Sequence, residues 1–134
     1  MAETRTLVPG VARAPALVLD EPMSLWGGID PATGDIVDAH HPQRGARVSG
    51  AVLVMPGGRG SSSSSTVLAE AVRAGTAPAA IVLREPDPIL ALGAIVAREL
   101  YGTQIPVIVA SVPIATGRDV RITATAEGAT IELV

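Results

Sequence analysis

The sequence predicts an α/β domain with a central, mostly parallel sheet, two main helices and a barrel-like antiparallel part. Residues 51–110 alternate apolar strand-like runs with helix-like segments, in the order strand, helix, strand, helix, strand. This order is typical of parallel strands joined by right-handed crossovers. Residues 120–134 instead alternate apolar and polar side chains around Glu127 and Gly128, which indicates an antiparallel hairpin. Hydrophobic residues make up 48% of the chain but aromatic residues only 1%, so the core must consist of Ala, Val, Ile and Leu.

Short apolar runs bounded by Gly or Pro predict the strands, at residues 6–8, 16–19, 51–55, 79–83, 106–110, 120–125 and 129–134. The first two strands are expected to be separated by turn residues at Pro9, Gly10 and Pro15. The third run is apolar throughout, as expected of a central strand whose two faces are both covered.

Helical periodicity predicts two helices, at residues 63–74 and 89–101. Gly75 and Gly102 follow them directly and are expected to end them. Asp87 is expected to cap the N-terminus of the second helix, and a serine to start the first.

The stretch from residue 26 to 47 holds too many Gly, Pro, Asp and His residues for regular structure and is expected to form one long loop. Such loops are usually functional or disordered. Within it, His40 and His41 beside Asp38 are candidates to move a proton or orient a carboxylate; the alternative is a solvated loop turned by the following proline. Two adjacent histidines are too few for a metal site. Trp26 beside two glycines suits a flat contact with a partner protein.

Length, charge and cysteine count limit the function classes. The 134 residues suffice for one core, and no linker divides them, so residues 1–134 are expected to form a single domain. The net charge is −3, so the chain lacks the excess of positive charge that is typical of nucleic-acid-binding proteins. No run is apolar enough to span a bilayer and no leader is visible, which predicts a cytoplasmic protein. With no cysteine, the chain can form no disulfide and supply no thiolate to an iron–sulfur cluster.

The run from Pro56 to Ser65 combines three glycines, an arginine and five consecutive serines between a predicted strand and a predicted helix. Such a turn gathers unpaired backbone N–H groups, a guanidinium and hydroxyls where an anion can sit. A flexible linker and a simple helix N-cap are the alternatives. A Walker phosphate loop is excluded, because its spacing and its Lys are missing.

These motifs together resemble the swivelling, small-subunit domain of the aconitase X family. The resemblance rests on Gly27-Gly28-Ile29-Asp30-Pro31-Ala32-Thr33-Gly34, then the His41-Pro42 step, then Gly57-Gly58-Arg59-Gly60 with its five serines, in this order. It covers the chain from about residue 6 to 134 and implies a swivelling β/β/α fold. Members of the family are dehydratases that act on cis-3-hydroxy-L-proline in bacteria or on mevalonate 5-phosphate in archaea. Some hold both parts in one polypeptide, and others divide them into a large and a small subunit.

The resemblance also implies roles for individual residues. The general base of this superfamily is a serine directly after an Arg/Lys-Gly step, which corresponds to Ser61, with Ser62 as the second choice. Arg59, Gly60, Ser62 and His41 are expected to bind substrate, and no residue of this chain is expected to bind metal. Related enzymes carry Gly-Ser-Ser-Arg at this loop, and this departure leaves open which arginine holds the substrate.

The expected function is that of the small subunit of a two-component hydro-lyase, which dehydrates cis-3-hydroxy-L-proline to Δ1-pyrroline-2-carboxylate. The expected partner is a Cys-bearing large catalytic subunit, in a heterodimer or higher complex, which carries an iron–sulfur cluster. Two alternatives stay open: the small subunit of a mevalonate 5-phosphate dehydratase, and a non-catalytic anion-binding module. The sequence decides neither the hydroxy-acid substrate nor the cluster type nor the stoichiometry.

Overall fold

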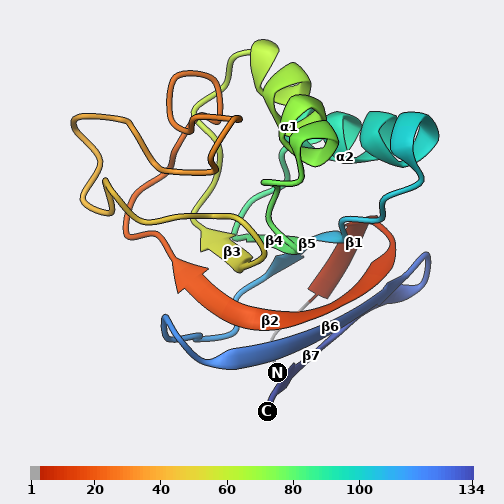
Figure 1. The fold of residues 1–134 in the computed structure, drawn as a ribbon. Helices are drawn as coiled ribbons and strands as arrows, with labels where there is room; N and C mark the ends of the chain where they lie inside the picture. Colours follow the sequence, from red (N-terminus) through yellow and green to blue (C-terminus); the bar gives the residue numbers. More distant parts are fainter. Residues whose placement is uncertain (1–3) are drawn as a thin grey trace.

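The structure is a computed structural model that describes residues 4–134, in which seven strands and two helices form a β/β/α arrangement (Figure 1). The strands are β1 (Thr4–Val8), β2 (Gly10–Val18), β3 (Val52–Met55), β4 (Ala80–Leu83), β5 (Val107–Ala110), β6 (Asp119–Thr125) and β7 (Gly128–Leu133). The helices are α1 (Ser63–Ala74) and α2 (Pro88–Tyr101).

The seven strands make one sheet in the order β1-β5-β4-β3-β2-β6-β7. The four central strands β5, β4, β3 and β2 are parallel, whereas β1, β6 and β7 pair with their neighbours in the antiparallel sense. The two ends of the sheet curl toward each other, and Thr4 Oγ1 donates a hydrogen bond of 2.8 Å to the carbonyl of Ala129 in β7. The predicted combination of a mostly parallel centre and a barrel-like antiparallel part is confirmed.

The central strands separate two apolar cores. Leu53 and Met55 of β3 face the helices, while Val52 and Val54 face the barrel-like part, and all four are buried. The alternation follows from the two-residue period of a strand. It explains why this strand is apolar at every position, as the sequence predicted.

The two helices cover one face of the sheet (Figure 1). They approach each other closely at Gly93 of α2. A β-carbon at residue 93 would lie 2.9 Å from the carbonyl oxygen of Ser65 and 3.2 Å from the side chain of Leu68, both on α1. The predicted helix ends are confirmed, since Gly75 and Gly102 adopt the left-handed conformation directly after the two helices.

One local expectation was wrong. Pro15 is not a turn residue, because β2 runs through it: its first part pairs with β6, and residues 16–18 pair with β3. Pro15 lies where the pairing changes from one neighbour to the other, so its missing N–H removes little from the ladder. A serine does start α1, as expected: Ser62 occupies the N-cap position, although its side chain makes no capping hydrogen bond.

Residues 26–47 form the expected long loop, without any helix or strand. The loop is nonetheless anchored, because Ile29 and Ile36 are buried in the core beneath the helices. Asp35 and Arg47 connect its two arms through an ion pair of 2.9 Å. In the part of the chain that the structure describes, neither helix has the length and apolar character needed to cross a membrane.

Candidate active site

The loop of residues 56–62, called the glycine–serine loop below, connects the carboxyl end of β3 to α1. Ligands of parallel α/β sheets bind at this end of the strands. Gly58 lies against Asp87, so that a β-carbon at residue 58 would overlap the carboxylate oxygen Oδ2. Asp87 Oδ1 accepts the backbone N–H groups of Ile89 and Leu90 at 2.9 and 3.1 Å, which confirms the predicted N-cap. The N-terminus of α2 therefore supports the glycine–serine loop from one side.

Ser61 has a backbone φ of +66° and is the one non-glycine residue with positive φ among residues 4–134. The left-handed conformation costs an L-residue about 1–2 kcal/mol. Strain of this kind persists where the surroundings impose it, and it is concentrated at functional sites. The side chain of Ser61 is exposed. The backbone N–H groups of Ser61, Ser62 and Ser63 find no acceptor within the described residues, so a hydroxyl and several donors share one open surface.

The five serines have different roles. Ser61, Ser62 and Ser63 are exposed, whereas Ser64 is only 3% exposed and faces the protein interior. Ser65 donates a hydrogen bond of 2.8 Å to the carbonyl of Ser62. Because the last three serines form the first turn of α1, the flexible-linker interpretation of this run is wrong.

Ser64 connects the helix to two loops. Its Oγ lies 3.3 Å from the carbonyl oxygen of Gly60 and 3.0 Å from Ser24 Oγ, and it accepts the backbone N–H of Trp26 at 3.3 Å. Ser24 Oγ also donates to the carbonyl of Gly60, at 3.3 Å. The carbonyl group directly before Ser61 therefore meets two hydroxyls.

Arg59 and His41, two predicted substrate-binding residues, both contact Glu21. Arg59 Nη2 lies 3.5 Å from Glu21 Oε1 in a half-exposed ion pair. The ring of His41 is buried; its Nδ1 accepts the N–H of Gln43 at 3.0 Å, which leaves Nε2 to donate to the Glu21 carbonyl at 3.1 Å. Arg59 is thus exposed beside Ser61, whereas both nitrogens of His41 are engaged within the chain. The substrate-binding role of each residue stays a prediction.

Two further loop residues face solvent. His40 is exposed, and its backbone N–H donates to Asp38 Oδ1 at 3.0 Å. Trp26 is 60% exposed and lies at an open hollow of about 340 Å³, which Pro31, Ser63, Val67 and other residues of α1 complete. The loop that precedes β3 thus brings an exposed aromatic ring beside the start of α1.

The described residues do not fit an iron–sulfur cluster or another metal centre. The chain has no cysteine, and within residues 4–134 no group of three or more His, Asp or Glu side chains lies close enough to share a metal ion. Thiolates are the usual ligands of such clusters.

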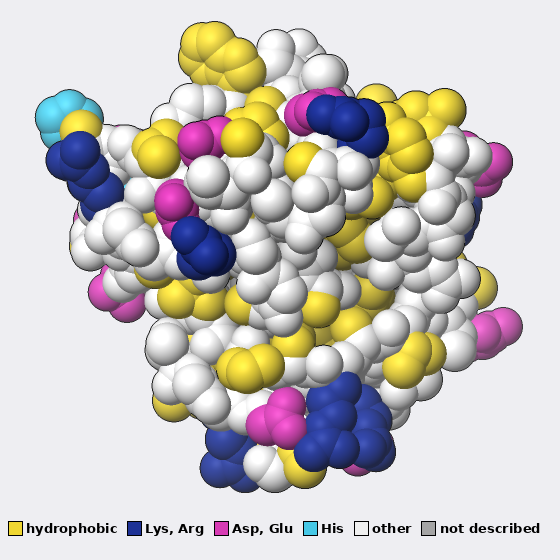
Figure 2. Space-filling model, in the orientation of Figure 1, with side chains coloured by type: hydrophobic (Ala, Val, Ile, Leu, Met, Phe, Trp, Pro, Cys, Tyr) yellow, Lys and Arg dark blue, Asp and Glu magenta, His cyan; other side chains and the backbone are white. Residues whose placement is uncertain are grey.

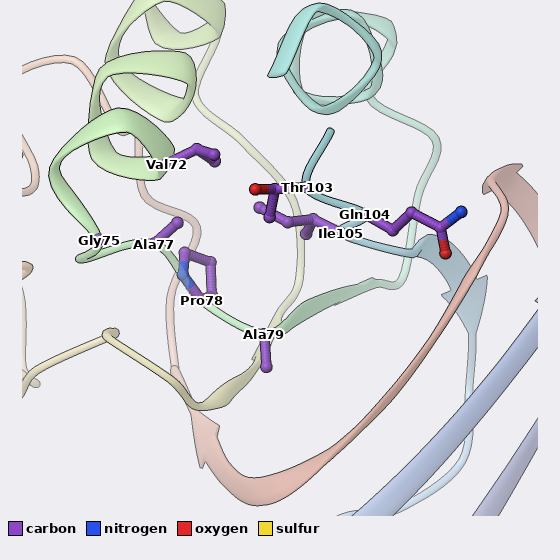
Figure 3. A pocket seen from close by; sticks show the side chains of 8 residues that line it. All are labelled: Val72, Gly75, Ala77, Pro78, Ala79, Thr103, Gln104 and Ile105. Atoms are coloured by element: carbon purple, nitrogen blue, oxygen red, sulfur yellow. The ribbon is translucent and has the colours of Figure 1, made fainter. Parts of the chain in front are cut away.

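A second hollow, of about 310 Å³, lies at the other end of α1 (Figure 3). Apolar side chains such as Val72 and Ile105 line it, together with Thr103 and Gln104. The helix is twelve residues long, or roughly 18 Å, and three of the serines form its opposite end. The hollow presents no acid, base or cation and is separate from the glycine–serine loop.

Three contacts at this site were not predicted from the sequence. They are those of Glu21 with Arg59, of Ser24 with the Gly60 carbonyl, and of Asp87 with Gly58. No pattern around Glu21 and Ser24 distinguishes them, because their contacts arise between loops about 40 residues apart in sequence. The burial of Ser64 did have a signal. It shares the helical spacing of Leu68 and Ala71, which are buried on the same face of α1.

Comparison with known proteins shows the family. The family model of the aconitase X swivel domain matches residues 1–133. The cis-3-hydroxy-L-proline dehydratase of Pseudomonas aeruginosa is 52% identical over 103 residues, which are 77% of this chain but 18% of that protein. The phosphomevalonate dehydratase small subunit of Methanothermobacter thermautotrophicus is 44% identical over 95 residues, which are 71% of this chain and 72% of that subunit.

A solved structure agrees with the sequence comparisons. The crystal structure of Thermococcus kodakaraensis aconitase X in its holo-form matches 99% of this chain and 97% of that chain, with a TM-score of 0.87 and 34% identity. A match of this extent shows a common fold over the whole chain, including the β/β/α arrangement that the resemblance implied. The chain belongs to the aconitase X swivel-domain family.

Proposed function

We propose that this chain is the small subunit of a two-component hydro-lyase and that Ser61 is its general base. The observation that carries the proposal is the conformation of Ser61: an exposed hydroxyl on a strained, left-handed residue, beside free backbone N–H groups, at the carboxyl end of a parallel strand. Strained backbone at such a position is typical of functional loops. The two named relatives, a dehydratase and a dehydratase small subunit, support the reaction class.

The proposed reaction on cis-3-hydroxy-L-proline is an anti elimination. The hydroxyl lies on the same ring face as the carboxylate, so the hydrogen on C2 lies on the opposite face. Ser61 in its alkoxide form takes the C2 proton, the electron pair of that bond forms the C2–C3 double bond, and the C3–O bond breaks. An acid on the opposite ring face, supplied by the partner, gives a proton to the departing hydroxyl, which leaves as water. The enamine then tautomerises to Δ1-pyrroline-2-carboxylate. Base and acid must lie on opposite sides of the ring, which suits a site shared between two chains.

A neutral serine is a weak base, so the site must stabilise the alkoxide of Ser61. Backbone N–H groups and positive charge favour the ionised form of an acid. The start of α1 presents such N–H groups, and Arg59 brings the charge of a guanidinium within two residues. Glu21 offsets part of that charge in the isolated chain. We therefore expect substrate or partner binding to draw Arg59 away from Glu21 and toward the substrate carboxylate.

The proposed partner is a large subunit that carries the cysteines this chain lacks. An iron–sulfur cluster, which the resemblance to aconitase-type enzymes implies, would supply Lewis-acid assistance to the departing hydroxyl when bound to that subunit. The relative from Pseudomonas is consistent with a larger enzyme, because the matched domain is 18% of its length. A cytoplasmic location stays a prediction.

The exposed apolar surface also supports a partner. Large apolar side chains are exposed on or beside the helices: Trp26, Leu92, Ile95, Leu100 and Tyr101. Figure 2 shows hydrophobic side chains on the upper part of the face that it presents. Contiguous exposed apolar residues mark interaction sites. Because Trp26 lies beside the start of α1, a large subunit seated here would also cover Ser61.

Mevalonate 5-phosphate is the second candidate substrate. The match to phosphomevalonate dehydratase small subunits favours it, because this chain covers 72% of such a subunit. The higher identity to a hydroxyproline dehydratase favours the first candidate. A phosphate needs more cations than the one that Arg59 supplies in the loop, and the large subunit would have to add them.

The test is reconstitution. This chain and its large subunit should each be assayed alone and together, on cis-3-hydroxy-L-proline and on mevalonate 5-phosphate. We expect turnover only when both chains are present, and on only one of the two substrates. Full turnover by this chain alone would contradict the shared site. A pair that binds a hydroxy acid but converts neither substrate would favour the non-catalytic anion-binding module.

A further inference from the structure

We propose that Ser24 and Ser64 are positioning residues: together they form a hydroxyl clamp on the Gly60 carbonyl that holds Ser61 in its left-handed conformation. The inference rests on the proposed function, because the clamp matters for the reaction only if Ser61 is the general base. Its basis is independent geometry, namely the hydrogen bonds around one carbonyl group and the backbone angles on both sides of it.

The clamp has two hydroxyls on one acceptor. Ser64 Oγ and Ser24 Oγ each lie 3.3 Å from the carbonyl oxygen of Gly60, and the two hydroxyls lie 3.0 Å from each other. Ser64 is 3% exposed, so water cannot easily replace its hydroxyl. The backbone N–H of Trp26 donates to Ser64 Oγ at 3.3 Å, which directs the serine's own proton toward Gly60 or Ser24.

The clamped carbonyl belongs to the peptide group that joins Gly60 to Ser61. Gly60 and Ser61 have φ values of +81° and +66°. A flip of the peptide between them would change the φ of Ser61 by about half a turn and return it to the negative region that L-residues prefer. Such a flip would also turn the Gly60 carbonyl away from both hydroxyls. The clamp therefore opposes the relaxation that would move the Ser61 hydroxyl.

Both members of the clamp are held by rigid parts of the fold. Ser64 is in the first turn of α1, on the face that buries Leu68 and Ala71 against the core. Ser24 lies between Met23 and Leu25, whose side chains are completely buried. A side chain intended to position another must itself be fixed by packing, and this condition is met on both sides.

The kinetic test uses the reconstituted complex with the substrate that it converts. Replacement of Ser64 by Ala, or of Ser24 by Ala, should lower kcat about 10- to 100-fold with little change in KM, because a base displaced by about 1 Å loses that much rate. Ser65→Ala is the matched control, since Ser65 Oγ bonds the carbonyl of Ser62 instead, and it should keep near-normal kcat. Ser24→Thr retains the hydroxyl and should restore most of the rate.

A double variant separates positioning from general stability. In the Ser61→Ala background the base is already absent, so Ser64→Ala should cause no further loss of the residual rate. A further loss of the same size as in the wild-type background would overturn the proposal in favour of a structural role. Equal kcat for the Ser64→Ala and Ser65→Ala complexes would overturn it as well.

A spectroscopic measurement on the isolated chain needs no activity. The Cα and Cβ chemical shifts of Ser61 report its backbone conformation, and they should move from left-handed toward ordinary values in Ser64→Ala and Ser24→Ala but not in Ser65→Ala. Unchanged Ser61 shifts in both variants would refute the clamp. If Ser61→Ala keeps turnover, the proposed base is wrong, and these shifts still decide whether the clamp exists. If Ser64→Ala folds poorly, Ser24→Ala still provides the test, because Ser24 is less buried than Ser64.

Discussion

Ser61 combines an exposed hydroxyl with a backbone conformation that few non-glycine residues adopt. A β-carbon in the left-handed region costs about 1–2 kcal/mol, whereas glycine adopts it freely. The loop thus keeps a side chain where stability alone would favour glycine. The conflict is physically reasonable if the hydroxyl is needed at this position, because functional sites often sacrifice some stability.

The strain at Ser61 predicts a measurable difference between two substitutions. Ser61→Gly should be more stable than Ser61→Ala by about 1 kcal/mol, since the alanine keeps the β-carbon and the glycine removes it. Neither variant retains the hydroxyl, so both should lose most of their turnover in the complex. Denaturant unfolding of the isolated variants measures the difference. Equal stability, or a more stable alanine variant, would show that the left-handed conformation is not strained in solution.

The glycine–serine loop shows how much of the candidate site can be predicted from residue types alone. The sequence identified the loop, because glycines and serines between a strand and a helix are visible as a pattern. It did not separate the exposed Ser61 from the buried Ser64, because the helical spacing of Ser64 with Leu68 and Ala71 marks the inward face only once the start of α1 is known. That distinction depends on where α1 begins and on the contact with Ser24, which comes from a different loop.

At the scale of elements, α1 and α2 hold the candidate site through their close contact at Gly93. Glycine within a helix is normally about 1 kcal/mol less favourable than alanine. Propensity alone would therefore make Gly93→Ala stabilising. The carbonyl oxygen and Cα of Ser65 lie 2.9 and 3.0 Å from the position of the added carbon, and backbone atoms of a helix cannot move independently.

We therefore predict that Gly93→Ala destabilises the chain by about 1–3 kcal/mol, the usual cost of overpacking. The free energy of unfolding from a denaturant titration provides the measurement. Gly57→Ala is a suitable control, because a β-carbon at residue 57 meets no atom within 4 Å and its φ is not positive. A stabilised Gly93→Ala variant would mean that the helices are farther apart than in this structure.

The long loop contains an ion pair whose pH dependence can be predicted. The guanidinium of Arg47, hydrogen-bonded to Asp35 at 2.9 Å, lowers the pKa of that carboxyl below its ordinary value. A carboxyl with a lower pKa in the folded state stabilises the fold above its unfolded pKa and loses this contribution as the pH falls through the folded pKa. The contribution should therefore be constant at neutral pH and disappear below about pH 4.

Asp35→Asn tests this directly. The difference in unfolding free energy between the wild type and Asp35→Asn should be constant from pH 5 to 8 and shrink on acidification below about pH 4. Denaturant titrations across the pH range provide the measurement. A difference that stays constant at low pH, or that grows, would show that the Asp35–Arg47 pair does not connect the loop arms in solution.

The elements themselves were largely readable from the sequence, because apolar periodicity and glycine stops depend on neighbouring residues. The central strands, both helices and the final hairpin lie within one or two residues of their predicted positions. The exception is β2, whose residues 10–15 pair with β6 more than 100 positions away. Pairing over such a distance overrides the local turn signal of Pro15 and is invisible to local patterns.

For the whole molecule, the central question is whether the site is complete in one chain. The candidate base Ser61 and Arg59 are exposed, the clamp residue Ser64 is buried, and no metal-binding cluster lies among residues 4–134. The relatives include a protein in which this domain is 18% of the length and a separate small subunit. Both arrangements are consistent with half of a shared active site, which a large subunit would close.

The most direct measurement is turnover and C2-proton exchange with solvent by complexes that contain Ser61→Ala or Ser62→Ala. We predict that the Ser61→Ala complex assembles and binds substrate, while its turnover falls by roughly 10²–10⁴-fold or more, as expected for loss of a positioned base. Exchange of the C2 proton should vanish with it, whereas Ser62→Ala keeps the base and should lose much less of turnover and exchange. Near-normal turnover in Ser61→Ala together with loss in Ser62→Ala would move the base by one residue. Near-normal turnover in both variants would contradict the central claim that this loop supplies the base.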